Sequence, residues 1–496
     1  MKRKFSYILV AMLAAGSAGA QEISDAMRYA QDNLTGTARF RAMGGAFGAL
    51  GGDFSALNVN PAGSAVFAAN QIGLSLSLLN TGNRSDYFGT RRDENNFSFD
   101  INQAGGVFVY DNEDEASGWK KVALALNYEN MNNFENSLFS AGTNPTHSID
   151  SYFLSYANGA DVTLSTLENA YFEELGFGAA QAYLGYQGYV INPVSDDPTN
   201  TLYETNVPAG GDYYQENALV STGFNGKLTF NVAAQYRDRL FVGLNLNSHF
   251  TDYRVSTSFY ERNQNSPEEG LQRLRFNNDL YTAGHGFSFN LGTIFKVTEE
   301  FRAGLAYESP TWYRLTDELS QSLTSVTAEQ PSTVIVDPAV TVVYAPYKLQ
   351  TPGKWTGSMA YIFGQKGLIS IDYSLKDYGN TRFRPENDFT GTNATMSNLL
   401  DASSEIRMGG EYRIKQWSLR GGYRFEQSPY KDGTTIGDLN GFSAGLGYSF
   451  DNNRIDLAYS HSRRDSRQAF FSQGLVDPAL INTVQNNVTI SAVFGF

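Results

Sequence analysis

Few residues of this sequence are of the types that carry out chemistry, and those present are scattered. The best match to a catalytic pattern is Ser443 in Gly-Phe-Ser-Ala-Gly, residues 441–445, which fits the G-x-S-x-G pattern of hydrolases. In those enzymes the serine lies on a sharp turn from a strand into a helix. Ser443 instead lies in a run of alternating apolar and small polar residues, which predicts an uninterrupted strand. We therefore interpret the match as coincidental and expect that the protein is not an enzyme.

The sequence also lacks a recognisable metal or cofactor pattern. The histidines do not have the spacing of metal ligands, and the absence of cysteine excludes disulfides and thiolate metal sites. No glycine-rich run continues into Lys-Ser or Lys-Thr, as a nucleotide-binding loop would. We expect no metal and no cofactor. A haem receptor stays open as an alternative, because His147 lies in a tyrosine-rich segment and haem is held by such side chains. The four histidines are His147, His249, His285 and His461.

The amino terminus has the features of a secretory signal. Three basic residues, Lys2 to Lys4, precede an apolar run, and Ala18-Gly19-Ala20 supplies small residues for cleavage. We predict a signal peptide at residues 1–20, cleaved after Ala20. Its removal takes away three positive charges and changes the net charge from −14 to −17. Such an acidic chain would be repelled by nucleic acid, so no nucleic-acid partner is expected.

Composition indicates what kind of element fills the mature chain. The sequence contains 48 Gly, 30 Tyr and 34 Phe, with a mean hydropathy of −0.34. After the signal, no apolar stretch is long enough to span a bilayer as a helix. Strands of a membrane barrel alternate lipid-facing apolar residues with polar lumen-facing ones, so their average hydropathy stays low. The predicted fold class is all-β, a transmembrane antiparallel β-barrel in contact with outer-membrane lipid.

Alternation is clearest near the carboxyl terminus. Val488, Ile490, Phe494 and Phe496 share one face of the last predicted strand. Residues 405–414 and 417–426 place charged side chains at every second position, too regularly for those charges to face lipid. A final strand ending in an aromatic residue resembles the signal by which outer-membrane barrels are recognised. We therefore expect the barrel-assembly machinery to engage the strand that ends in Phe496.

The connections between the predicted strands indicate about fourteen strands, residues 69–496. Short connections alternate with long ones, which we assign to the periplasm and the outside respectively. The longest outer loops are predicted at residues 133–220 and 317–347. Within the first, a helix is expected over residues 164–175, with Ser165 and Glu168 as a capping box and Gly176 as its end. A lumen of fourteen strands is too wide for its own side chains to fill, so a plug is expected.

Residues 36–67 supply a segment suited to plugging a lumen. They are rich in glycine and other small residues, which allow tight turns and close backbone approach. Asn60-Pro61 predicts a forced turn, because a proline restricts the residue before it. We predict that residues 21–68 form a hatch inside the barrel.

This segment resembles the hatch of the FadL/TodX family of outer-membrane transporters of hydrophobic compounds. The resemblance rests on a small-residue run, an acidic residue and Asn-Pro-Ala just before the first strand. The matching residues are Gly44, Gly45, Asp53, Asn60, Pro61 and Ala62. It implies passive diffusion of a hydrophobic or amphipathic small molecule, such as a long-chain fatty acid, across the outer membrane. Among the hatch residues, the aromatic side chains predicted to touch ligand are Phe40, Phe47 and Phe54.

The resemblance leaves a second role open, since some relatives serve as shuttle subunits of type IX secretion, in which the long loops would bind a secreted protein. The family is also known to release ligand sideways through a gap at a kink in the third strand. In this sequence the interruption is found in the second strand, at Asn102 to Gly106. We expect a bulge there, with Phe97, Phe99 and Ile101 facing outward and Val107 and Val109 resuming that face.

Overall fold

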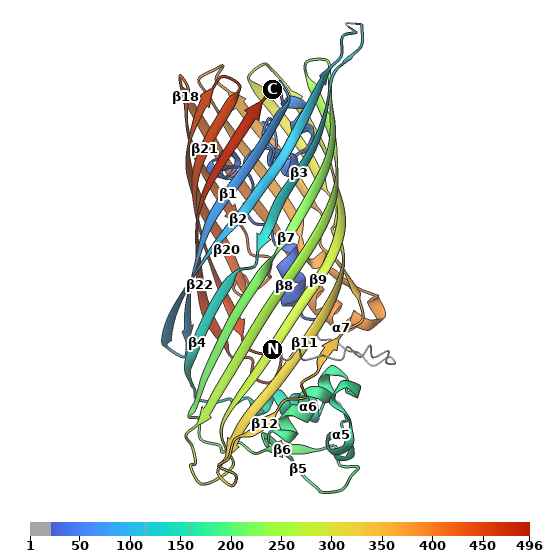
Figure 1. Ribbon diagram of the computed structural model, residues 1–496, viewed down its shortest axis with the longest axis vertical. Coiled ribbons are helices and arrows are strands. Elements are labelled where there is room, and N and C mark those ends of the chain that lie inside the picture. The colour runs from blue at the N-terminus through green and yellow to red at the C-terminus, as the bar shows by residue number, and fades with distance from the viewer. Residues whose placement is uncertain (1–20, 115, 160) are drawn as a thin grey trace, which may run out of the picture.

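The computed structural model describes residues 21–114, 116–159 and 161–496, so the predicted signal peptide and its cleavage site lie outside the described residues. Fourteen antiparallel spans form a closed barrel, as predicted, with β1 paired to both β2 and β22 (Figure 1). In chain order the spans are β1 (Gln71–Tyr87), β2 (Thr90–Asp111), β3 with β4 (Trp119–Asn133, Asn136–Asn144), β7 (Tyr213–Tyr236), β8 (Leu240–Asn263), β9 (Leu271–Lys296), β10 with β11 (Phe301–Glu308, Trp312–Thr327), β14 with β15 (Tyr347–Gln350, Lys354–Ile362), β16 with β17 (Gly367–Asp377, Arg382–Arg384), β18 (Ala402–Ile414), β19 (Trp417–Glu426), β20 (Ile436–Phe450), β21 (Asn453–Ala469) and β22 (Pro478–Gly495).

The predicted two-residue alternation sorts side chains between the two faces of the wall. On β22, Val488, Ile490 and Phe494 are exposed on the outer face, while the intervening Thr489 and Ser491 are buried. All charged residues of β18 and β19 except Arg413 are buried on the lumen side, among them Glu405, Glu411 and Arg424. This arrangement follows from the strand geometry, which sends successive side chains to opposite faces. The terminal Phe496 is exposed, and its role in assembly stays a prediction.

The expected bulge in β2 is present, but its effect on the strand was predicted wrongly. The β1–β2 register shifts at Ser75/Leu76, so that Asn102 is the extra residue. One extra residue exchanges the two faces of everything that follows. Phe97 and Ile101 therefore face outward as predicted, whereas Val107 is fully buried inside and Phe108 takes the outer face.

One end of the barrel carries short turns and the other carries helices (Figure 1). At the helical end, the connection from β4 to β7 contains α4 (Asp150–Ala157), α5 (Leu164–Asn169), η2 (Phe172–Glu174), α6 (Phe177–Gln187) and the β5–β6 hairpin (Ile191–Pro193, Tyr203–Thr205). Further short elements there are β12 (Val334–Val336), β13 (Thr341–Val343), η3 (Tyr378–Asn380), η4 (Glu386–Phe389) and α7 (Thr390–Leu399). No helix among the described residues is both long enough and apolar enough to cross a membrane.

The predicted caps of the loop helix are wrong. Thr163 caps α5, accepting a hydrogen bond from the Thr166 backbone N–H, and the helix ends at Asn169. Gly176 precedes α6 rather than ending α5. The strands also extend further toward this end than the sequence indicated: β4, β7 and β11 all enter the ranges expected as loops. Beyond the hydrocarbon core of the membrane, both faces of a strand contact water. The alternation of apolar and polar residues that identifies a strand in the sequence is therefore weaker there.

Candidate functional site

The hatch lies inside the barrel and consists of α1 (Ile23–Ala30), α2 (Ala38–Ala42), α3 (Ala56–Val59) and η1 (Pro61–Val66). Figure 1 shows these blue elements enclosed by the wall. Helix α2 contacts β19 to β22, whereas η1 contacts β3 and β7 to β9. The segment therefore reaches widely separated parts of the wall, and its residues from Ala38 to Gly51 are buried. It closes the lumen as a plug would.

The Asn60-Pro61 turn packs against a pair of glycines in the wall. The Asn60 amide donates to the Gly48 carbonyl at 2.7 Å and to the Thr293 carbonyl of β9 at 2.9 Å. Gly243 and Gly292 lie directly opposite each other in the β8–β9 ladder. A Cβ atom on either would come within 2.4 Å of this turn, so only bare backbone leaves room for it. The turn thus fixes the hatch to β8 and β9.

A second pair of wall glycines, in β18 and β19, leaves room for the part of the hatch around Gly44. Gly44 has a φ of +62°, and a Cβ there would lie 2.9 Å from the Tyr423 carbonyl of β19. Its N–H donates to Ser443 Oγ at 3.1 Å, and Ser443 donates in turn to the Ala42 carbonyl. Gly409 and Gly422 are paired across β18 and β19 beneath this contact. Ser443 is thus a hatch-binding residue in a strand, which agrees with the interpretation that its motif is coincidental.

Buried polar side chains add further attachments. Asp53 accepts hydrogen bonds from the Thr37 hydroxyl at 2.7 Å and the Ser55 N–H at 3.0 Å, holding the hatch against itself. Arg39 in α2 pairs with Glu411 of β18 at 2.9 Å. Glu411 also pairs with Arg413 and Arg420, so Arg39 joins the hatch to a cluster of buried charges in the wall.

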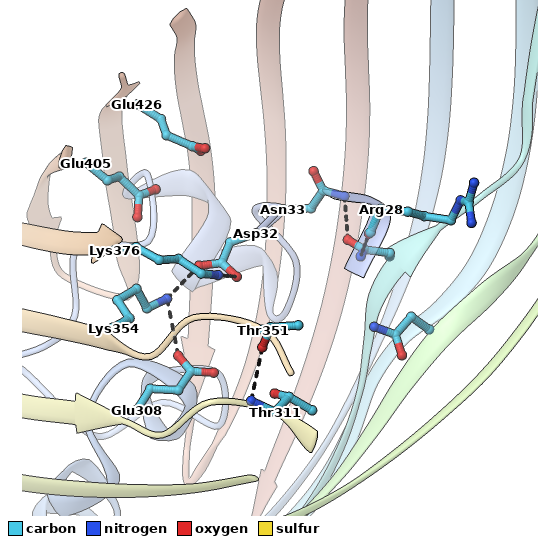
Figure 2. Close-up of polar contacts among 12 residues, drawn as sticks. Arg28, Asp32, Asn33, Glu308, Thr311, Thr351, Lys354, Lys376, Glu405 and Glu426 are labelled. Atoms are coloured by element: carbon cyan, nitrogen blue, oxygen red, sulfur yellow. Dashed lines mark hydrogen bonds and ion pairs between the residues drawn. The ribbon is translucent and has the colours of Figure 1, made fainter. Parts of the chain in front are cut away.

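Asp32 fixes the stretch between α1 and α2 to the wall. Its carboxylate pairs with Lys354 of β15 at 2.8 Å and with Lys376 of β16 at 3.0 Å, and Lys354 also reaches Glu308 at 3.4 Å (Figure 2). Burial opposes the charged form, yet the two ammonium groups hold the pKa of Asp32 well below its usual value. Helix α1 is therefore tethered by a carboxylate that stays ionised.

The aromatic residues predicted to touch ligand are packed between the hatch and the inner face of the wall. Phe40 and Phe47 form an aromatic pair with ring centroids 5.5 Å apart, and Phe54 pairs with Phe67 at 5.4 Å. All three predicted residues are at most 4 % exposed. None of them is among the residues that line the lumen cavity described next. Their contact with ligand stays a prediction.

A cavity that is partly open to solvent lies beside the hatch in the lumen. Arg41 and Gly44 of the hatch and the wall residues Asp100, Asn130 and Asn133 are among its lining. The apolar lining residues are Leu34, Leu79, Leu439 and Phe442. The cavity is therefore amphipathic, with polar groups in the majority.

The barrel wall is interrupted beside this cavity. Within the described residues, the β2–β3 ladder joins Gln103–Asp111 to Lys121–Glu129 and stops there. After a break at Phe134 and Glu135, β4 continues the pairing with β7 but lies against the lumen side of β1. The Ser85 and Ser140 hydroxyls of β1 and β4 are 2.6 Å apart, which shows this displacement. The third span thus leaves the wall on its way to the helical end.

Beyond the last β2–β3 pair, β3 stays paired with β7 up to Asn133, so an opening is left in the wall between β2 and β3. Its outer lining includes Phe97, Phe99 and Phe224, which are apolar and face the membrane. Asp100, Asn130 and Asn133 line both this opening and the lumen cavity. Three polar side chains are therefore shared by the two spaces.

Sequence reasoning missed Asp32, Arg41 and the shared side chains Asp100, Asn130 and Asn133. A partial signal for the opening exists, because residues 129–133, Glu-Asn-Met-Asn-Asn, place polar residues on both faces of a strand. No comparable pattern surrounds Asp32, whose partners are more than 270 residues away in the chain. Among the described residues, no group of three or more His, Asp and Glu side chains is arranged to hold a metal ion.

Comparison with known families decides the assignment. Residues 191–494 match the family model described as outer membrane protein transport protein (OMPP1/FadL/TodX), which is more than half of the chain. The chain belongs to the FadL/TodX family. This places the barrel in the outer membrane among transporters of hydrophobic compounds. No curated protein matches its sequence.

Solved structures show the same fold as this FadL/TodX-family barrel. A FadL homologue from Pseudomonas aeruginosa is 13% identical, with a TM-score of 0.56, covering 94% of this chain and 99% of its own. The toluene transporter TodX from P. putida is 15% identical, with a TM-score of 0.53 and the same coverage. The Ralstonia pickettii toluene transporter TbuX is 16% identical, with a TM-score of 0.50 and again 94% and 99% coverage. At these identities the likeness concerns the fold.

Proposed function

We propose that this FadL/TodX-family barrel moves a hydrophobic or amphipathic small molecule inward by passive diffusion, with exit through the side wall. One observation carries the proposal: the lumen cavity and the wall opening share Asp100, Asn130 and Asn133. A ligand in the cavity is thus separated from the membrane by three side chains. The solved structures named above include toluene transporters, which are consistent with a hydrophobic small molecule as the proposed cargo of this chain.

The hatch controls entry in this mechanism. Helix α1 lies in the lumen, with Gln21 bonded to Asp317 of β11 at 3.0 Å and Asp32 bonded to the two lysines. Displacement of the segment before α2 would widen the path from the helical end to the cavity. The contacts of η1 with β8 and β9 would keep the rest of the hatch in place during that movement.

The side exit is tested by closing it. Ser98 and Asn133 contact each other across the opening, with Asn133 Nδ2 3.0 Å from Ser98 Oγ. Because the chain has no cysteine, the only intramolecular disulfide that the double variant Ser98→Cys/Asn133→Cys can form is the one across the opening, and its formation on oxidation is checked by mass spectrometry. We expect uptake of radiolabelled fatty acid or toluene by intact cells to fall on oxidation and to return on reduction.

A control pair in the neighbouring β1–β2 hairpin tests the effect of cross-linking itself. Arg84 and Asp93 lie opposite each other in the β1–β2 ladder, and the variant Arg84→Cys/Asp93→Cys should transport normally in both states. Asn133→Trp provides a steric block that needs no disulfide. Normal uptake in the oxidised Ser98/Asn133 variant and in Asn133→Trp would refute the side exit. Normal uptake in cells lacking the protein, together with defective protein secretion, would instead favour the shuttle role.

A further inference from the structure

A groove on the outer face of the barrel lies away from the lumen and from the opening in the wall. It runs over neighbouring strands from β10 to β19, toward the end with short turns (Figure 1). Its floor is formed by Gly410 of β18 and Gly421 of β19, which are paired across the two strands. We call this feature the wall groove. The large apolar side chains that line it and are exposed on the outer face are Met359, Tyr361, Ile369, Ile371 and Met408.

Contacts within the protein do not explain the two floor glycines. The adjacent Gly409 and Gly422 face the lumen, where the backbone of the hatch leaves no room for a side chain. Gly410 and Gly421 face the other way, and neither has a positive φ. A Cβ on them would have its nearest neighbour in the described chain at 3.6 Å and 4.0 Å, which is ordinary contact. Because a glycine weakens a strand and often marks the close approach of a ligand, the pair indicates an object that packs on the outer face.

Two cations without an acidic partner lie at the end of the wall groove. Lys366 and Lys415 are exposed in the β15–β16 and β18–β19 turns, which join strands that line it. These turns are neighbours, since the Arg413 N–H donates to the Lys366 carbonyl at 2.8 Å. Neither ammonium is within 4 Å of a carboxylate oxygen of the described residues. The flanking turns at residues 297–300 and 451–452 carry acidic charges only, so positive charge is concentrated below the wall groove.

The distance between the floor and the lysines matches the depth of one membrane leaflet. Gly410 and Lys415 are five residues apart, which gives about 17 Å along a strand at about 3.4 Å per residue. With the usual strand tilt of about 40°, this is about 13 Å along the membrane normal, or roughly half of an apolar band about 25 Å tall. A lipid whose phosphate lies at the lysines therefore has an acyl chain long enough to cover the floor glycines.

We propose that the wall groove binds a phospholipid of the periplasmic leaflet, with an acyl chain on Gly410 and Gly421 and an anionic head group on Lys366 and Lys415. The leaflet follows from the assignment of the short turns to the periplasm. The site is separate from the transport path, so the proposal goes beyond the transport function. It distinguishes this lipid from the others that surround the barrel by its head-group charge, because basic residues at a membrane surface attract anionic lipids.

Native mass spectrometry of the full-length protein released from detergent micelles tests the head-group contact. Dioleoylphosphatidylglycerol and dioleoylphosphatidylcholine, which have the same acyl chains, are titrated separately. We expect wild type to bind the anionic lipid about tenfold or more tightly than the zwitterionic one. The double variant Lys366→Gln/Lys415→Gln should lose this preference. Arg237→Gln/Arg239→Gln removes two exposed cations from another short turn and should keep it.

Filling the floor tests the acyl-chain contact. Gly410→Leu/Gly421→Leu should weaken binding of both lipids about tenfold or more, because the apolar contact area of the chain is lost. Gly357→Leu is the matched control. Gly357 is also exposed on the outer face, in β15, with nothing within 4 Å of a new Cβ, but it does not line the wall groove. This variant should bind both lipids as wild type does.

Equal binding of the two lipids by wild type, an undiminished preference in Lys366→Gln/Lys415→Gln or an unchanged affinity in Gly410→Leu/Gly421→Leu would overturn the inference. A dimer in the same spectra that is lost in Gly410→Leu/Gly421→Leu would also overturn it, because the wall groove would then be an interface between two copies of the chain. The compact migration of unheated barrel in detergent gels shows in every variant that the protein is folded.

Discussion

Replacement of Asp32 by asparagine is expected to free helix α1 without unfolding the barrel. The change keeps the shape of the side chain but removes the charge that Lys354 and Lys376 share at 2.8 and 3.0 Å. Lys354 retains Glu308 at 3.4 Å, whereas Lys376 loses its carboxylate partner. The Asp32 and Lys376 side chains are 23% and 12% exposed, so the charges are only partly screened by water.

The size of the effect follows from this geometry. Breaking a buried ion pair by removing one partner costs about 3–5 kcal/mol. Partial exposure and the remaining amide oxygen favour the lower value, about 3 kcal/mol, or roughly a 100-fold change in an equilibrium. Opening of the segment before α2 should therefore become about 100-fold more frequent. The readout is amide hydrogen exchange of residues 23–30, with the strands β8 and β9 as an internal reference.

Two variants make this prediction specific. Asp93→Asn breaks the Arg84–Asp93 pair, whose side chains are 61% and 59% exposed, and should leave exchange of α1 unchanged. Asp32→Asn/Lys376→Met removes the stranded cation as well, so part of the lost protection should return. Exchange in Asp32→Asn that equals wild type would refute the reasoning that this ion cluster tethers the segment.

Four further outcomes are expected. Because the pKa of Asp32 is depressed in the folded protein, its tether is complete above the unfolded pKa of about 4 and is lost as the pH falls below it, so the protection factor of α1 (its exchange corrected for the intrinsic pH dependence of amide exchange) should be constant from about pH 8 to 5 and fall in stronger acid. Gly44→Ala should lower the thermal midpoint more than Gly364→Ala, since both have positive φ (+62° and +56°) but only Gly44 has wall atoms within 4 Å of a new Cβ. Ser443→Ala should cost about 1 kcal/mol of hatch attachment, measured by exchange of residues 38–44, and ester hydrolysis above background that is lost in this variant would revive the hydrolase hypothesis. Phe47→Ala should destabilise the protein by about 3 kcal/mol or more in thermal or denaturant unfolding, because the ring is fully buried; a much smaller loss would mean that the site collapses around the missing ring.

The sequence allowed the barrel to be predicted because its strands leave a local pattern, whereas the action of residues 21–68 as a plug stays a prediction. Period-two alternation marks each membrane-facing strand, and Asn60-Pro61 in a glycine-rich run marks the hatch. The phase of β2 beyond Asn102 was mispredicted, because one extra residue reverses the faces without changing the composition. The contacts of Asp32 and Arg41 could not be predicted, because they depend on which strands face each part of the hatch. Those strands are hundreds of residues away in the chain. The inward displacement of β4 could not be predicted either, because β4 pairs with β7 without a register shift and so leaves no local signal in the sequence.

The inward course of β4 has a consequence for the energetics of transport. An opening set by the backbone is crossed only by the side chains of Asp100, Asn130 and Asn133, so passage through it would need these side chains to rotate but no shift of the hatch. In the proposed mechanism the hatch would then control the inlet, and the lipid phase would act as the sink that draws solute through. The net flow would be driven by how strongly the solute prefers oil to water, and its direction would reverse if the surrounding bilayer were loaded beforehand.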